Sequence, residues 1–168
     1  MISFMSQLLI SGDSWYCSAI NDIIDIHPEV EYALNCNEPV VALESAVVTH
    51  GLPYPENFTT AKSLENIVRF AGSVPATIAI ISGKIKVGLK LEELQRLADP
   101  TRNRSLAKVS IRDVSPCIAL KIDGGTTCSA TSMIASLCGI KVSNSVGLVI
   151  FCFSYSIRFL VLEGRLVF

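Results

Sequence analysis

The chain has 168 residues, of which 50% are hydrophobic and 17% are charged, and its formal net charge is −1. This length predicts one domain, and the apolar share is ample for a core. The near-neutral charge and the lack of a basic stripe exclude a nucleic-acid groove. Six cysteines without CxxC spacing, together with only two histidines, argue against a zinc site of the usual Cys/His type.

Both ends of the chain differ in pattern from its middle. The start, "MISFMSQLLI", has neither the charge nor the cleavage site of a secretory signal. We therefore expect buried free thiols in a reducing intracellular compartment, cytoplasmic or organellar. Residues 1–26 are weakly patterned and predict a poorly ordered lead-in. Residues 143–168 form an apolar, β-prone tail without the run of ~20 apolar residues that a spanning helix needs, so we expect no membrane anchor.

The first half of the middle segment alternates helix and strand patterns. Residues 27–35 predict a helix, with Pro28 in its first turn. Residues 39–45, "PVVALES", predict a short buried strand. A rigid loop with two prolines follows over residues 50–57. Residues 59–72 then predict an amphipathic helix that ends at Gly72. The expected apolar face of this helix consists of Ala61, Leu64, Ile67, Val68 and Ala71.

The second half continues the alternation. It predicts a buried strand over 74–82, a turn at Gly83, a half-exposed strand over 84–89, a strand over 107–110, a helical or extended segment over 114–122, and a strand from 140 onward. Residues 90–99 predict a surface helix with Leu91, Leu94 and Leu97 facing inward. A buried helix is expected to begin near Thr126. Strands that alternate with helices indicate an α/β fold, layered as a sandwich.

Glu44 stands at the end of the first buried strand and is the first candidate for chemistry. Open α/β sheets bind their ligands beyond the carboxyl ends of their strands. Apolar neighbours disfavour a charged carboxylate, which makes Glu44 a candidate proton donor near neutral pH. The alternative is a glutamate that pairs with a nearby arginine or lysine. His50, in the following loop, has either a catalytic or metal-binding role or a purely structural hydrogen bond.

Two further segments predict anion binding. In "DGGTTCSAT", residues 123–131, glycines precede Thr126 and Thr127 at a helix start. Backbone N–H groups and hydroxyls would then converge on one point, which suits a phosphate. In "KVSIRD", residues 108–113, the ammonium of Lys108 could hold a phosphate or a sugar hydroxyl. The alternatives are an ordinary helix N-cap and a cluster of surface charge in which Arg112 and Asp113 pair with each other or with the backbone.

Four blocks, "PVVALES…HGLPYPEN", "GSVPATIAIISGKIKVGL", "KVSIRD" and "GGTTCSAT", resemble the pseudouridine-5'-phosphate glycosidase family, also called pseudouridylate synthases. The resemblance covers residues 27–142, which would be the N-terminal part of a glycosidase domain. Enzymes of that family reversibly split pseudouridine 5'-phosphate into uracil and ribose 5-phosphate. The resemblance implies an α/β sandwich, a homotrimer, a lysine that forms a Schiff base with the opened ribose, and a divalent metal, usually manganese.

The resemblance also implies roles for single residues. Glu44 matches the glutamate that donates a proton, Lys108 matches a lysine that binds substrate, and Cys128 falls at a substrate-contact position. The small-molecule partners would be pseudouridine 5'-phosphate, ribose 5-phosphate and uracil.

The sequence departs from the family pattern in two places. Ile111 replaces an arginine of the family's "KVSRRD" block. From residue 143 onward, the tail resembles no part of the family, and the glycine-rich stretch, the metal-binding aspartate and the Schiff-base lysine are absent. We therefore expect an incomplete fold, no assigned metal ligand and no catalytic activity. The alternative is a non-catalytic isoform that binds substrate weakly or joins full-length subunits. Residues 142–144 can be encoded as a splice donor, so the tail is a candidate translated intron.

Overall fold

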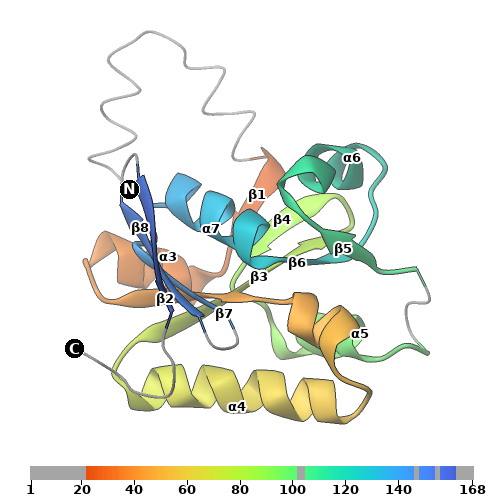
Figure 1. The fold of residues 1–168 in the computed structure, drawn as a ribbon, viewed down its shortest axis with the longest axis horizontal. Coiled ribbons are helices and arrows are strands. Elements are labelled where there is room, and N and C mark those ends of the chain that lie inside the picture. The colour runs from red at the N-terminus through yellow and green to blue at the C-terminus, as the bar shows by residue number, and fades with distance from the viewer. Residues whose placement is uncertain (1–21, 102–104, 146–147, 154–155, 162–168) are drawn as a thin grey trace, which may run out of the picture.

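A mixed β-sheet with helices on both faces makes up the part of the chain that the structure describes (Figure 1). This computed structural model describes residues 22–101, 105–145, 148–153 and 156–161, and the side chains of residues 22–101 and 105–141. The fold class predicted from the sequence, a layered α/β sandwich, is confirmed.

Nine strands are described, and seven of them follow one another across the sheet in the order β1-β4-β3-β2-β7-β8-β9. β6 pairs with β3 and with β5, off this path. β2 lies parallel to β3 and β7, whereas β4 and β6 run antiparallel to β3. The bounds are β1 Ile24–Ile26, β2 Val40–Glu44, β3 Val74–Ile81, β4 Lys84–Val87, β5 Ala107–Val109, β6 Gly124–Thr126, β7 Val142–Ser145, β8 Leu148–Phe153 and β9 Ser156–Val161.

The helices divide between the two faces of the sheet, as the alternation along β3 shows. Ile78 and Ile80 pack into the main core with α3 (Pro28–Asn35), α6 (Val114–Ala119) and α7 (Cys128–Leu137). Ala79 and Ile81 point to the opposite face and pack against Leu97 of α5 (Leu91–Ala98). α4 (Glu56–Phe70) and the π-helical turn η1 (Val47–Gly51) complete that second layer with α5. A 3-10 turn, η2 (Ile111–Asp113), precedes α6.

The ends of β2 and β6 meet along the same edge of β3. Glu44 is the register partner of Ile78, and β6 takes over pairing with β3 from Ala79 onward, in the opposite direction. Both strands therefore end at the same point, where the backbone carbonyl of Ile78 accepts hydrogen bonds from the Ser45 hydroxyl at 2.6 Å and the Thr126 hydroxyl at 2.6 Å. This junction brings the segments after the two strands to one place.

Several expected elements are confirmed with shifted bounds. α3, β2, β3 and β4 lie where the sequence predicts them, and segment 114–122 contains helix α6. α4 begins at Glu56 instead of residue 59, so the rigid loop shrinks to the residues between η1 and α4. The helix expected near Thr126 begins at Cys128, because residues 124–126 pair as strand β6.

The expected inward faces of two helices are wrong at single positions. Ile67 and Ala71, assigned to the buried face of the helix over 59–72, are exposed, whereas Ala61 and Val68 are buried. On α5, Leu94 and Leu97 are buried but Leu91 is exposed. The neighbouring layer covers only a narrow stripe of each helix, so side chains at the margin of the apolar face remain in water.

The structure also corrects the expectations for the chain ends and the cysteines. Residues 24–26, expected in an irregular lead-in, form β1 and pair with β4; residues 1–21 lie outside the described residues. The backbone of β7, β8 and β9 extends the sheet as successive antiparallel pairs beyond β2. Cys117 and Cys138 are buried as expected, but Cys36 is exposed. No helix in the described residues has the length and apolar character needed to cross a membrane.

Candidate functional site

A hydrogen bond joins the two segments that the strand junction brings together. The Cys128 thiol donates to Oε2 of Glu44, with 2.9 Å between sulfur and oxygen. Glu44 is the last residue of β2, and Cys128 is the first residue of α7. Glu44 is half-buried and lines a cavity. The sequence-predicted acid therefore lies at the start of the sequence-predicted anion-binding helix.

A cavity of about 730 Å³ opens at this junction. Its walls come from the end of β2, from η1, from α4, from β5 and from the start of α7. The lining residues are Glu44, Ala46, Val47, His50, Gly51, Leu52, Thr60, Lys108, Thr127, Cys128 and Ser129. Five residues singled out from the sequence thus share one cavity: Glu44, His50, Lys108, Thr127 and Cys128. Its size lies within the range of small-molecule sites.

Thr126 does not line the cavity. It is fully buried, and its hydroxyl lies 2.6 Å from the Ile78 carbonyl and 2.8 Å from the Thr131 hydroxyl. Its backbone N–H donates to the Ser45 hydroxyl at 2.9 Å. Thr126 therefore fixes the strand junction from beneath. Thr127 is the residue at the rim, where its hydroxyl lies 3.2 Å from the Val109 carbonyl and 3.1 Å from the Ser129 hydroxyl.

The two glycines before Thr126 serve close packing, not a flexible anion loop. They belong to β6, which lies between β3 and β5 in the sheet. A Cβ on Gly124 would lie 2.8 Å from the Ala107 carbonyl oxygen, and a Cβ on Gly125 would lie 2.7 Å from the Ser45 carbonyl oxygen. Both distances are too short for a side chain. The convergence of donors at the cavity therefore comes from the first turn of α7, whose N–H groups have no partner within the helix.

The wall formed by η1 and the proline loop is held by a buried asparagine. The side-chain amide of Asn57 donates to the carbonyls of Val48 at 2.7 Å and Ala98 at 2.9 Å. The Asn57 side-chain oxygen accepts from the N–H of Phe58 at 2.7 Å. One side chain thus ties the starts of α4, η1 and the end of α5 together. These hydrogen bonds hold η1, and with it His50, at the wall of the cavity.

Lys108 and its neighbours form the remaining side of the site. Lys108 lies on β5 opposite Gly125 in the register and is exposed to water. Asp113, which the sequence left open to pairing with Arg112 or the backbone, accepts from the hydroxyl and the N–H of Ser110. These two hydrogen bonds lower the pKa of the Asp113 carboxyl. Ile111, at the position where the family has arginine, is exposed and is not a cavity residue.

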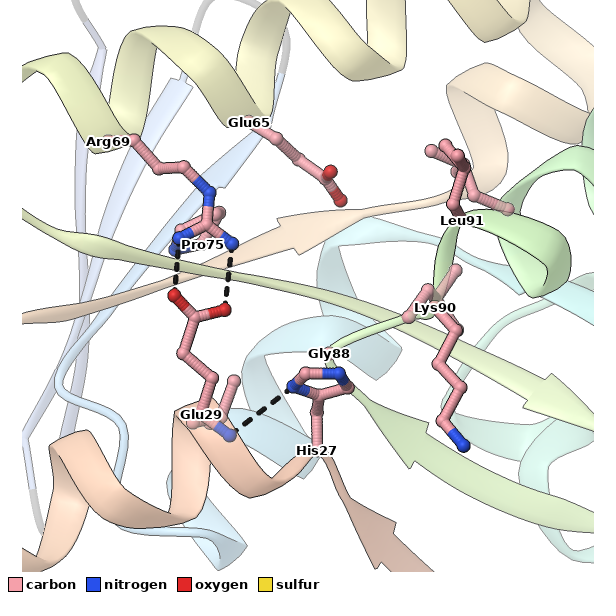
Figure 2. A pocket seen from close by; sticks show the side chains of 11 residues that line it. His27, Glu29, Glu65, Arg69, Pro75, Gly88, Lys90 and Leu91 are labelled. Atoms are coloured by element: carbon pink, nitrogen blue, oxygen red, sulfur yellow. Dashed lines mark hydrogen bonds and ion pairs between the residues drawn. The ribbon is translucent and has the colours of Figure 1, made fainter.

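A second, smaller cavity of about 310 Å³ lies between α3, α4 and the start of α5 (Figure 2). Figure 2 shows Arg69 and Glu29 facing each other across it, joined by two hydrogen bonds. The guanidinium holds the pKa of the Glu29 carboxyl below its usual range. Glu65 accepts from the Thr77 hydroxyl at 2.6 Å, and the ring of His27 accepts from the N–H of Glu29. The first pair links α3 to α4, the Thr77–Glu65 bond links β3 to α4, and His27 caps α3. Each contact therefore has a structural role.

The described residues contain no group of three or more His, Cys, Asp or Glu side chains arranged to hold a metal ion. The manganese that the sequence resemblance implies therefore has no ligand set among them.

A family model described as indigoidine synthase A like protein matches residues 29–149. This range is more than half of the chain, so the chain belongs to the indigoidine synthase A-like family. The matched range ends seven residues beyond residue 142, where the resemblance seen in the sequence ended.

Two curated relatives and one solved structure illustrate the similarity. The pseudouridine-5'-phosphate glycosidase of Rhodospirillum centenum is 49% identical over 129 residues, which are 77% of this chain and 39% of that protein. The pseudouridine-5'-phosphate glycosidase of Clostridium botulinum is 46% identical over 125 residues, 74% of this chain and 40% of that protein. The crystal structure of the prealnumycin C-glycosynthase AlnA in complex with ribulose 5-phosphate aligns with a TM-score of 0.65 at 36% identity, over 74% of this chain and 39% of that one.

The chain therefore spans about 40% of the length of the curated relatives it matches. Sequence reasoning missed Ser45 and Asn57, which are among the buried polar residues that fix the site. A hydroxyl directly after a strand and an asparagine in the first turn of a helix are available signals for such roles.

Proposed function

We propose that the described residues form the proton-transfer and sugar-phosphate-holding part of a pseudouridine-5'-phosphate glycosidase site. One observation carries this proposal: the Cys128–Glu44 hydrogen bond, which fixes a half-buried carboxyl beside the start of α7 inside one cavity with Lys108. The curated relatives bear the glycosidase name, and the AlnA structure contains a ribulose phosphate. These names support a sugar-phosphate ligand.

Glu44 would donate the proton to the uracil carbon when the carbon–carbon glycosidic bond breaks, and would remove it in the reverse direction. A general acid must lie within hydrogen-bond reach of the reacting atom in a site that limits access of water. Glu44 is half-buried, and the Cys128 thiol donates a hydrogen bond to its Oε2.

Lys108, Thr127 and Cys128 would hold the ribose phosphate. The Lys108 ammonium supplies a positive charge from the β5 side, and the N-terminal end of α7 supplies N–H donors from the other. Thr126 has a positioning role in this account, because its buried hydroxyl holds the junction from which α7 starts.

We further propose that this chain alone binds ribose 5-phosphate but does not release uracil from pseudouridine 5'-phosphate. The reaction implied by the resemblance needs a Schiff-base lysine and a metal-binding aspartate, and neither corresponds to a residue within the matched blocks. Lys121 and Lys141 do not match the reactive lysine, and neither lines the cavity. Full turnover and the trimeric assembly of the family would require parts of the relatives that lie beyond the matched residues.

A reducing intracellular location is consistent with this proposal. None of the cysteines among the described side chains, Cys36, Cys117, Cys128 and Cys138, takes part in a disulfide. Free thiols are the usual state of cysteines in such a reducing compartment.

Calorimetric titration of the purified chain with ribose 5-phosphate tests the proposal. We expect saturable binding that weakens about tenfold or more in Lys108→Ala, since a charged contact to phosphate is lost. Lys90→Ala is the matched control, because Lys90 lines the smaller cavity, and it should bind as the parent chain does. Equal weakening in both variants, or no binding by the parent chain, would refute the assignment. Release of uracil by the chain alone would refute the proposed lack of turnover.

A further inference from the structure

His50 lines the cavity but has no part in the function assigned so far. It lies in η1, one turn after the strand that carries Glu44, and its side chain is exposed at the cavity wall. A π-helical turn is uncommon and is frequently found at functional sites. The sequence left His50 open between a chemical and a structural role.

The neighbouring threonine is hydrogen-bonded to the His50 ring. The Thr49 hydroxyl oxygen lies 2.7 Å from Nδ1 of His50, but 3.4 Å from each of the carbonyl oxygens of Ser45 and Ala46. A hydroxyl has a single proton, and the contact at 2.7 Å is far better than the two at 3.4 Å. The direction of the 2.7 Å hydrogen bond depends on the tautomer of the ring, and in the tautomer that we assign the hydroxyl donates to Nδ1. A neutral ring must then hold its own proton at Nε2.

Thr49 is itself held in place by the strand junction. Its Oγ1 and Cγ2 occupy the space that a side chain on Gly125 would need. Gly125 lies opposite Lys108 in the register and directly precedes Thr126. The absence of a side chain at Gly125 thus seats Thr49, which in turn orients His50 beside the proposed phosphate site. This chain of contacts joins His50 to the same junction that positions Glu44 and α7.

We propose that His50 is a further ligand-contacting residue, whose Nε2–H donates a hydrogen bond to an oxygen of the bound sugar phosphate. Thr49 is the positioning residue that selects this tautomer. The inference rests on the proposed function, because it needs a sugar phosphate in the cavity. The ligand would then be contacted by His50 of η1, in addition to Lys108 of β5 and the start of α7.

The chain offers an internal control, since its only two histidines lie in different cavities. His27 caps α3 and faces the smaller cavity, as Figure 2 shows. Nitrogen-15 NMR of the unaltered, labelled chain resolves both rings and reports the tautomer of each. We expect His50 in the Nε2–H form, and a shift of its Nε2 signal on titration with ribose 5-phosphate while His27 stays unchanged. Signals are assigned with His50→Gln and His27→Asn.

Variants distinguish a direct contact between His50 and the ligand from a purely structural role of His50. His50→Phe keeps a ring without a donor and should weaken ribose 5-phosphate binding about tenfold. His50→Gln, which retains an N–H at the place of Nε2, should recover most of this loss. Thr49→Val should abolish the tautomer preference and weaken binding to a smaller extent.

The outcomes distinguish this inference from the proposed function. If ribose 5-phosphate binds in a Lys108-dependent manner but the His50 signals do not move, only the present inference is overturned. If the ligand does not bind at all, both are overturned. The shift measurement uses the unaltered chain, so it decides the matter even if a variant fails to fold.

Discussion

The thiol of Cys128 donates a hydrogen bond to the carboxylate of Glu44, across 84 positions of sequence. This contact exists because β2 and β6 approach the same point of β3 from opposite directions and end there. A buried set of hydroxyls, from Ser45, Thr126 and Thr131, fixes that point. The acid and the start of α7 are thereby positioned by the sheet.

Gly125→Ala should disrupt this junction. The added methyl would meet the Ser45 backbone and Thr49, neither of which can move without breaking η1 away from β6. We expect a loss of more than ~2 kcal/mol in the free energy of unfolding, as for other overpacked core positions, measured by denaturant titration. Gly51→Ala is the control, because its methyl would meet a Val47 side-chain methyl at 3.1 Å, which can shift. Equal stability of both variants would show that the junction tolerates a side chain.

The Cys138 thiol should make stability depend on alkaline pH. Burial raises the pKa of this thiol to about 12, from 9.0. Since the unfolded chain loses this proton first, the stabilising contribution is complete below pH 9.0 and falls as the pH rises toward 12. We expect the unfolding free energy of the parent chain to fall by up to ~1.4 kcal/mol per pH unit more than that of Cys138→Ala in this range. Parallel pH curves for the two proteins would contradict this, because all other titrating groups are shared.

The Arg69–Glu29 pair should contribute a small, acid-sensitive stabilisation between α3 and α4. The hydrogen bond from Arg69 lowers the pKa of Glu29, so the contribution is present above the ordinary glutamate range near 4.5 and is lost as the pH falls below it. Both side chains are about half exposed, so we expect a coupling energy of only ~0.5–1 kcal/mol at pH 7. A double-mutant cycle with Arg69→Gln and Glu29→Gln measures it. Coupling of the same size at pH 3 would contradict the ionic origin.

The comparison of sequence and structure separates what local pattern determines from what packing determines. Strand β2 and helix α3 were predictable because a β-branched apolar run and a proline in a first turn are local signals. The start of α7 was not, because the pair Gly124 and Gly125 is typical of a flexible turn. The pair becomes a strand because it lies between β5 and the edge of β3, which has no partner from β2 beyond Ile78.

The site shows the same division. Glu44, Lys108 and Cys128 were predicted from strand ends and motif blocks, and the structure brings them to one cavity. Thr126 was expected at its surface but lies beneath it, because the pleat of β6 alternates its side chains and directs that of Thr126 into the core. Sequence periodicity predicts which residues share a face of a helix, but not how much of that face another layer covers. The exposed Ile67 and Leu91 follow from this.

Protection of Cys128 from alkylation by ribose 5-phosphate tests the central claim most directly, because this thiol lies between the proposed acid and the proposed phosphate site. The unaltered chain is treated with iodoacetamide with and without saturating ribose 5-phosphate, and each cysteine is followed by peptide mapping. We predict that the ligand slows the reaction of Cys128 several-fold and leaves exposed Cys36 unaffected. Alkylation of Cys128 at the same rate with and without the ligand would contradict a sugar-phosphate site at the junction of Glu44 and α7.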